Sequence, residues 1–177
     1  IPSTVKTIGE SAFKSCTSIR EINIDPYQTL VNNSAFENCT SLEHLNINTN
    51  ETSIRQIDMT PYSSIKRIKI PNNITTIEGS AFKGCSTIKK INIPDSVTTI
   101  GESAFSECTS LMKITIPNSV TDLNKSVFEG CTSLKKVVLS SSITFIQSST
   151  FKDCKSLSKI DIPISIKVIK RYAFYNC

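Results

Sequence analysis

The sequence of 177 residues contains a single histidine, His44, and no tryptophan. One histidine leaves little room for His-based catalytic sites or for metal sites, which combine His with converging Cys, Asp or Glu ligands. No G-x-S-x-G, Gly-rich phosphate loop or H-E-x-x-H motif occurs. The Asp and Glu residues are scattered and form no converging pair. These absences argue against an enzyme, and the sequence points to no cofactor.

Long apolar runs are also missing. No segment approaches the roughly 18 apolar residues of a membrane-spanning helix, and no signal peptide is visible. We therefore expect no membrane insertion of these residues. Both ends look like cuts within a repeat, because Ile1 and Pro2 end one strand-bearing segment and Cys177 precedes where the next would begin. We expect a fragment of a longer protein, whose open ends associate end to end.

What the sequence has in quantity is one repeat. All seven cysteines lie 23 residues apart, except for one gap of 46 residues, and seven of the eight phenylalanines lie three residues before a cysteine. Met59 and Tyr62 occupy these two positions inside the gap. The phenylalanines that follow this rule are Phe13, Phe36, Phe82, Phe105, Phe128, Phe151 and Phe174.

The repeat unit reads C-x-S-L-x-x-I-x-I-P-x-S-V-x-x-I-x-x-x-A-F. Alternating residues such as Ile114 and Ile116 are typical of a strand with one buried face. The proline that follows, Pro117 in this copy, ends the strand because it has no N–H to donate. A second short extended piece follows, and the segment GESAFSEC, which carries Phe105 and Cys108, predicts a turn or two of helix or 3₁₀ helix.

One unit cannot bury its own apolar face, whereas stacked copies can. The spacing of Leu111, Ile114 and Ile116 matches the L-x-x-L-x-L core of leucine-rich repeats, whose period is about 20–29 residues. The fuller pattern, IP-S-V--IG--AF--C-SL--I-I, resembles the BspA-like leucine-rich repeat family. The resemblance implies an α/β leucine-rich-repeat solenoid, a curved right-handed stack of 23-residue coils with a parallel concave sheet and short helical turns. We expect one array over residues 1–177, of about seven and a half repeats, with a degenerate repeat near 48–70.

Two hypotheses explain the regular spacing of the cysteines. An identical residue in every coil is best explained as a small apolar side chain that fills one recurring position, which predicts seven free, buried thiols. The alternative is a disulfide between successive coils, since equivalent residues in adjacent strands lie roughly 5 Å apart, within reach of a bridge. Uniform spacing does not suit a metal site.

The variable positions of the predicted concave strands are rich in positive charge. The three outward positions of L-x-x-I-x-I hold ten Lys or Arg and three acidic residues over seven copies, which leaves ten basic and twelve acidic residues for the rest of the chain. The net charge of +5 is therefore a property of one face. The candidate binding residues are a row of Arg67, Lys90, Lys113, Lys136 and Lys159, with Lys66, Lys89, Lys135 and Lys69 beside it.

Two explanations of this basic row stay open. Charged strands resist edge-to-edge aggregation and keep a protein in solution. Alternatively the row binds anions, and an acidic protein segment or an acidic glycan would then be the partner. Nucleic acid is disfavoured because no aromatic residue interleaves with the lysines to stack on bases.

The degenerate repeat also has two readings. Met59 replaces the phenylalanine, Tyr62 replaces the cysteine, and Pro61 enters the predicted helical turn. Either the repeat has drifted and Met59 fills the aromatic gap, or Tyr62 and its neighbours make a contact on the convex side.

The resemblance implies a non-enzymatic binding module of a BspA-like surface protein, located at the cell surface or outside the cell, that mediates adhesion or host and matrix contacts. The alternative is a cytoplasmic structural or cytoskeleton-associated scaffold, which free thiols would suit.

Overall fold

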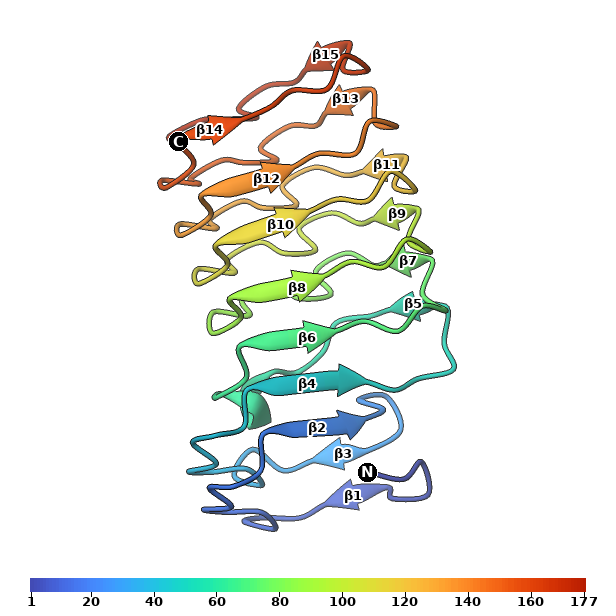
Figure 1. The fold of residues 1–177 in the computed structure, drawn as a ribbon, viewed down its shortest axis with the longest axis vertical. Coiled ribbons are helices and arrows are strands. Elements are labelled where there is room, and N and C mark those ends of the chain that lie inside the picture. Colours follow the sequence, from blue (N-terminus) through green and yellow to red (C-terminus); the bar gives the residue numbers. More distant parts are fainter.

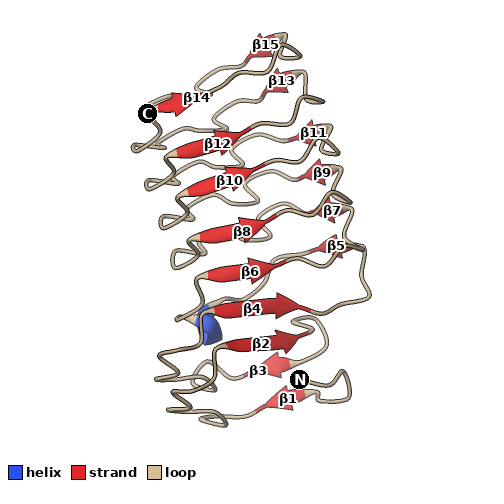
Figure 2. Ribbon diagram, in the orientation of Figure 1, coloured by secondary structure: helices blue, strands red, loops and turns tan.

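The computed structural model describes all residues from 1 to 177 as a stack of coils, and each coil carries a strand on either side (Figure 1). The even-numbered strands form what we call the main sheet, and the odd-numbered strands form the second sheet (Figure 2). The main-sheet strands are β2 (Glu21–Ile24), β4 (His44–Ile47), β6 (Arg67–Lys69), β8 (Lys90–Asn92), β10 (Lys113–Thr115), β12 (Lys136–Val138) and β14 (Lys159–Ile160).

The second sheet is built from two-residue strands. They are β1 (Thr7–Ile8), β3 (Leu30–Val31), β5 (Ser53–Ile54), β7 (Thr76–Ile77), β9 (Thr99–Ile100), β11 (Asp122–Leu123), β13 (Phe145–Ile146) and β15 (Val168–Ile169).

All strand pairs are parallel and in the register of the repeat. Ile68 in β6 lies beside Ile91 in β8, and Ile114 in β10 lies beside Val137 in β12. The main sheet consists of two hydrogen-bonded blocks, β2-β4-β6-β8 and β10-β12-β14. The predicted parallel solenoid is therefore confirmed.

The core lies between the two sheets and the turn side. Leu111, Ile114 and Ile116 are at most 1% exposed, as their alternation predicts. Next to them the phenylalanine rings stack along the solenoid axis, with centroids 5.4 Å apart for Phe82 and Phe105 and 5.6 Å for Phe105 and Phe128. The buried aromatic row is confirmed in the interior of the stack. Phe13 and Phe174 are only partly buried because an end coil has a neighbour on one side only.

The expected helical turns are wrong. The structure contains no α-helix, and its one helical segment is the 3₁₀ helix η1 (Thr60–Tyr62) in the degenerate repeat. In the regular coils this segment contains residues in the left-handed conformation, such as Ser103 at φ 57° and Glu107 at φ 61°, which a right-handed helix excludes. The backbone instead bonds between coils, and the Phe105 N–H donates to the Val127 carbonyl at 3.0 Å. The fold is a β-solenoid and not an α/β structure.

The thiols have a structural role in this arrangement. Except for Cys85, whose preceding coil has Met59 in place of the phenylalanine, each interior thiol donates to the carbonyl of the phenylalanine one coil earlier, as from Cys131 Sγ to the Phe105 oxygen at 3.1 Å. All seven cysteines are free. Burial raises the pKa of the Cys131 thiol to about 12, so it stays protonated and unreactive. The expectation of seven inaccessible thiols is wrong at the ends, because Cys177 is exposed and Cys16 is only partly buried.

The last coil, like the first, packs against one neighbour only. Its apolar side chains are accordingly exposed, and Ile169 is 51% exposed, whereas its interior counterpart Ile100 is fully buried. End-to-end association through such surfaces stays a prediction. The exposed apolar residues of this end are Ile162, Ile164, Val168, Ile169, Tyr172 and Tyr175.

Candidate binding surface

The main-sheet strands place the basic residues on the outside by simple alternation. In β6 the residues Arg67, Ile68 and Lys69 are exposed, buried and exposed in turn. The main-sheet strands β8, β10 and β12 repeat this pattern. Because equivalent residues are in register, the first residues of successive strands form a line. This line, which we call the basic row, consists of Arg67, Lys90, Lys113, Lys136 and Lys159.

The other four candidate residues flank this row. Lys69 is the last residue of β6, whereas Lys66, Lys89 and Lys135 each precede the first residue of a strand. The structure thus brings all nine candidate side chains to one face.

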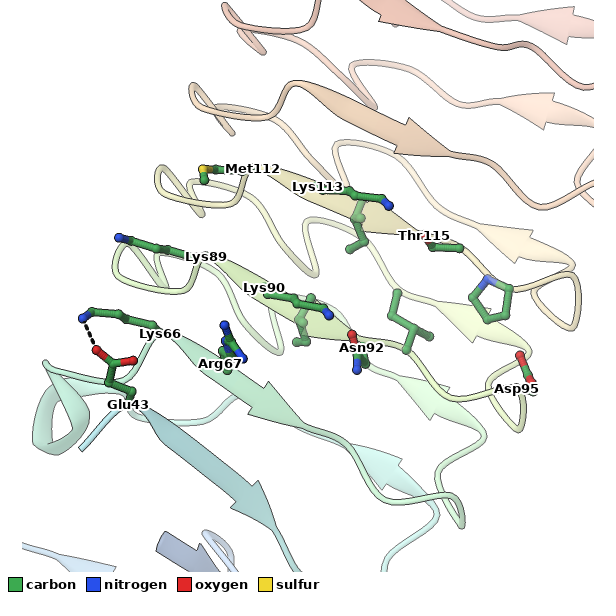
Figure 3. A pocket seen from close by; sticks show the side chains of 14 residues that line it. Glu43, Lys66, Arg67, Lys89, Lys90, Asn92, Asp95, Met112, Lys113 and Thr115 are labelled. Carbon is green, nitrogen blue, oxygen red and sulfur yellow. Dashed lines mark hydrogen bonds and ion pairs between the residues drawn. The ribbon is translucent and has the colours of Figure 1, made fainter. Parts of the chain in front are cut away.

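Two of the nine are neutralised by acidic neighbours. Lys66 forms an ion pair with Glu43, shown by the dashed line in Figure 3, and the hydrogen bond from Lys66 lowers the pKa of Glu43. Lys159 lies 3.9 Å from an oxygen of Asp161. The remaining seven cations form no ion pair: Arg67, Lys69, Lys89, Lys90, Lys113, Lys135 and Lys136.

Unpaired like charges on adjacent strands repel one another. Two ammonium groups roughly 5 Å apart cost on the order of 0.8 kcal/mol in a water-like dielectric. Elsewhere the chain relieves such repulsion by alternating the sign between coils, as in the pairs Lys14–Glu37 and Lys125–Glu102. On the main-sheet face the sign of the charge does not alternate between coils. A bound anion would therefore be stabilised, because it relieves this repulsion.

The face is hollowed at its centre. A groove of about 840 Å³ lies over β6, β8 and β10 (Figure 3), and the buried aliphatic residues Ile91 and Ile114 are among those that line it. The groove is lined by Glu43, Lys66, Arg67, Lys89, Lys90, Ile91, Asn92, Ile93, Asp95, Met112, Lys113, Ile114, Thr115 and Pro117.

Sequence reasoning treated the basic row as uniform and missed the groove. Its candidate binding residues include neither Met112, the one apolar residue in a column of charged and polar ones, nor Asn92 and Thr115, which line the groove. The break in the lysine column at Met112 was the available signal, because it marks a coil that differs from its neighbours.

The suggested convex contact through Tyr62 is wrong. Tyr62 is only 2% exposed, and its ring stacks on Phe36 with centroids 6.0 Å apart. Tyr62 therefore continues the aromatic row from the cysteine position of the repeat, while Met59 is only partly buried. The prediction that Met59 fills the aromatic gap is also wrong, because the ring that stacks on Phe36 is that of Tyr62.

The chain holds no group of three or more His, Cys, Asp or Glu side chains that would bind a metal ion. It also has no helix with the length and hydropathy that a bilayer crossing demands.

Solved structures that this chain matches include three leucine-rich repeat proteins, and the two with TM-scores above 0.5 share its fold. A leucine-rich repeat protein from Bacteroides ovatus is 29% identical with a TM-score of 0.70, over 88% of this chain and 43% of its own. The leucine-rich repeat protein of T. pallidum is 21% identical with a TM-score of 0.61, over 96% and 71%. A leucine-rich cell surface protein from Faecalibacterium prausnitzii is 26% identical with a TM-score of 0.40, over 100% and 62%.

The chain thus spans less than half the length of the B. ovatus protein that it matches. No curated protein matches it. The model of the BspA type leucine-rich repeat region matches residues 1–58 and 61–177 in six copies, which leaves out only two residues of the degenerate repeat. The chain therefore belongs to the BspA-type leucine-rich repeat family.

Proposed function

We propose that the chain is a non-enzymatic binding module that holds an acidic partner, a protein segment or an acidic glycan, against its main-sheet face. The observation that carries the proposal is the set of seven unpaired cations held in register on one exposed face. Solenoid repeats of this kind present extended surfaces for binding. Because these charges have no ion-pair partner within the chain, we propose that a ligand supplies one.

The proposal predicts binding that depends on salt and on charge. Exposed contacts are screened within about 10 Å at 0.1 M salt, so affinity for an acidic peptide or a sulfated glycan should fall steeply between low and high salt. The test titrates both probes against the chain and against Lys90→Glu/Lys113→Glu/Lys136→Glu. These side chains point away from the core, so the variant should keep its circular dichroism spectrum and lose binding.

Equal binding by both proteins, or binding by neither, would leave the basic row as a solvated face. A matched control reverses three lysines that lie off this face, Lys83, Lys125 and Lys152, each of which already has an acidic neighbour. This control has the same net charge as the test variant and should bind like the unaltered chain.

We place the module at the cell surface or outside the cell, in a BspA-like surface protein that mediates adhesion or host and matrix contacts. Family membership supports this placement. The alternative is a cytoplasmic structural or cytoskeleton-associated scaffold, which seven free thiols favour, since an oxidising compartment usually converts such cysteines to disulfides. Protease treatment of intact cells decides between them, because only a surface protein is cleaved.

A further inference from the structure

The main sheet is interrupted at one junction. Strands β6 and β8 are hydrogen bonded, as are β10 and β12, but β8 and β10 are not. At this junction the Met112 N–H lies 3.4 Å from the Lys89 carbonyl, whereas the Lys89 N–H lies 2.8 Å from the Lys66 carbonyl one coil earlier. We call the gap between Lys90–Asn92 and Lys113–Thr115 the seam.

The seam lies within the groove. Lys90 and Lys113 stand on its two sides, both exposed and without an ion pair, and Arg67 lines the groove on the next strand (Figure 3). These three cations are therefore the part of the basic row that shares one concave space. Lys136 and Lys159 belong to the same row but lie outside the groove, over strands whose ladder is intact.

Neutral donors at the seam are also unused. At the corresponding positions of β2 and β4, Asn46 donates to Asn23 at 2.8 Å. Asn92 and Thr115, which occupy these positions on either side of the seam, form no hydrogen bond through their side chains. The seam thus collects two ammonium groups, an amide and a hydroxyl that all lack partners.

Met112 supplies a different chemistry at the same place. It is 44% exposed and replaces the lysine that precedes the strand in the coils on either side, at Lys89 and Lys135. No aromatic residue lines the groove, so a sugar ring finds no flat apolar face there. A cationic centre beside an aliphatic contact suits a peptide with an acidic side chain next to an apolar one.

We propose that the seam between β8 and β10 is the anion-binding centre of this surface. There it receives the carboxylate of an extended partner peptide between Lys90 and Lys113, with an adjacent apolar side chain on Met112. This inference rests on the proposed function, since it locates and specifies the same binding surface. It differs in predicting that the lysines of the basic row are unequal.

The experiment compares two variants of equal charge. Lys90→Gln/Lys113→Gln removes two unpaired cations at the seam, and Lys135→Gln/Lys136→Gln removes two unpaired cations of the same face that lie outside the groove, where the ladder is intact. The probe is a labelled peptide of alternating Glu and Leu, with a Gln and Leu analogue and a sulfated glycan as comparisons. The seam variant should weaken peptide binding by about tenfold or more, the effect of losing a hydrogen bond to a charged group, and the control variant by less than about threefold.

A third variant, Met112→Lys, tests the apolar contact. It raises the positive charge, so a purely electrostatic surface would bind the Glu and Leu peptide more tightly, whereas the seam predicts weaker binding. Thermal melts of all three variants identify any that fail to fold. If the seam variant fails to fold, the single variant Lys113→Gln takes its place in the comparison.

The outcomes separate the two proposals. Equal losses in the two double variants would mean a diffuse basic row, so that the binding module stands and the seam fails. Binding of the glycan without the peptide would overturn the seam in the same way. Absence of binding by the unaltered chain to any probe at low salt would overturn both proposals.

Discussion

The regular coils and the degenerate coil of residues 48–70 share the strands of both sheets but differ on the turn side, where the degenerate coil forms η1 in place of left-handed bends. In the regular coils, rings such as Phe105 stack on both neighbours and a thiol such as Cys131 donates to a carbonyl of the previous coil. In the degenerate coil, Tyr62 supplies the ring from the cysteine position, and Cys85 makes no such bond to that coil.

The register of the main sheet is the same in the degenerate coil as in the regular coils. His44, Arg67 and Lys90 remain in register from β4 through the degenerate coil to β8. The backbone ladders of the sheet therefore hold the register, while the turn side needs only side chains that fill its volume.

The first prediction removes an aromatic ring from a regular coil. Phe105 is 1% exposed and stacked on both sides, so Phe105→Ala should lower the free energy of unfolding by about 3–5 kcal/mol. Met59→Ala, at the same position of the degenerate coil, should cost about 1–2 kcal/mol because Met59 is only partly buried. Urea denaturation of both variants measures the difference, and equal costs would contradict the assignment of Tyr62 as the ring of that coil.

The second prediction restores the regular residues to the degenerate coil. Met59→Phe alone should destabilise by about 1–3 kcal/mol, because a second ring would compete with Tyr62 for one space. Adding Tyr62→Cys should recover most of this loss. A double-mutant cycle from denaturation midpoints gives the coupling free energy, and additive effects would show that the two side chains do not share a volume.

The third prediction concerns the thiol of a regular coil. Cys131→Ala removes the hydrogen bond to the Phe105 carbonyl and should cost about 1–1.5 kcal/mol at neutral pH. The pH dependence has a definite sign, because burial raises the pKa of this thiol from 9.0 to about 12. The thiol therefore contributes stability below pH 9 that is lost as the pH rises towards 12.

Denaturation curves between pH 8 and 11 check this sign. The chain with Cys131 should lose more stability over this range than the Cys131→Ala variant, which serves as its own control for every other titrating group. Parallel curves for the two proteins would refute the linkage. Cys177→Ala should show a smaller effect of the same sign, because Cys177 is exposed although its thiol also donates to the Phe151 carbonyl and partial burial raises its pKa.

The fourth prediction isolates the hydroxyl of the degenerate coil. The Tyr62 hydroxyl forms no hydrogen bond within the chain, so Tyr62→Phe should change the free energy of unfolding by less than about 0.5 kcal/mol. Thermal melts measure the change. A loss above about 1 kcal/mol would mean that the hydroxyl, and not only the ring, holds this coil.

Much of this architecture was predictable because the residues that make each contact recur in every copy of the repeat. The alternation of Ile114 and Ile116 identified the main sheet, and the period of the phenylalanines identified their stack. The helical turns were predicted wrongly because the spacing of Phe105 and Cys108 fits one helical turn as well as it fits two bends. Only the conformation of Ser103 and Glu107, which a one-dimensional pattern does not reveal, separates the two.

The candidate surface was predictable in part for the same reason. Register and alternation placed the basic row on one face, whereas the seam depends on whether two particular strands close their ladder. The strands on both sides of the seam, β8 and β10, share one pattern of exposed, buried and exposed residues, so alternation and period do not reveal the break between them.

The left-handed residues have a consequence for how the array assembles. The coils of Phe105 and Phe151 each place two non-glycine residues in this conformation, Ser103 with Glu107 and Ser149 with Asp153, at a cost of roughly 1–2 kcal/mol per residue. A lone coil has no neighbour whose carbonyls repay that cost. Folding should therefore need at least two adjacent coils as a nucleus, after which each added coil gains a complete set of inter-coil bonds. Such an array lengthens or shortens most readily by whole units of 23 residues, because a partial unit incurs the strain of the turns without gaining the bonds of a complete junction.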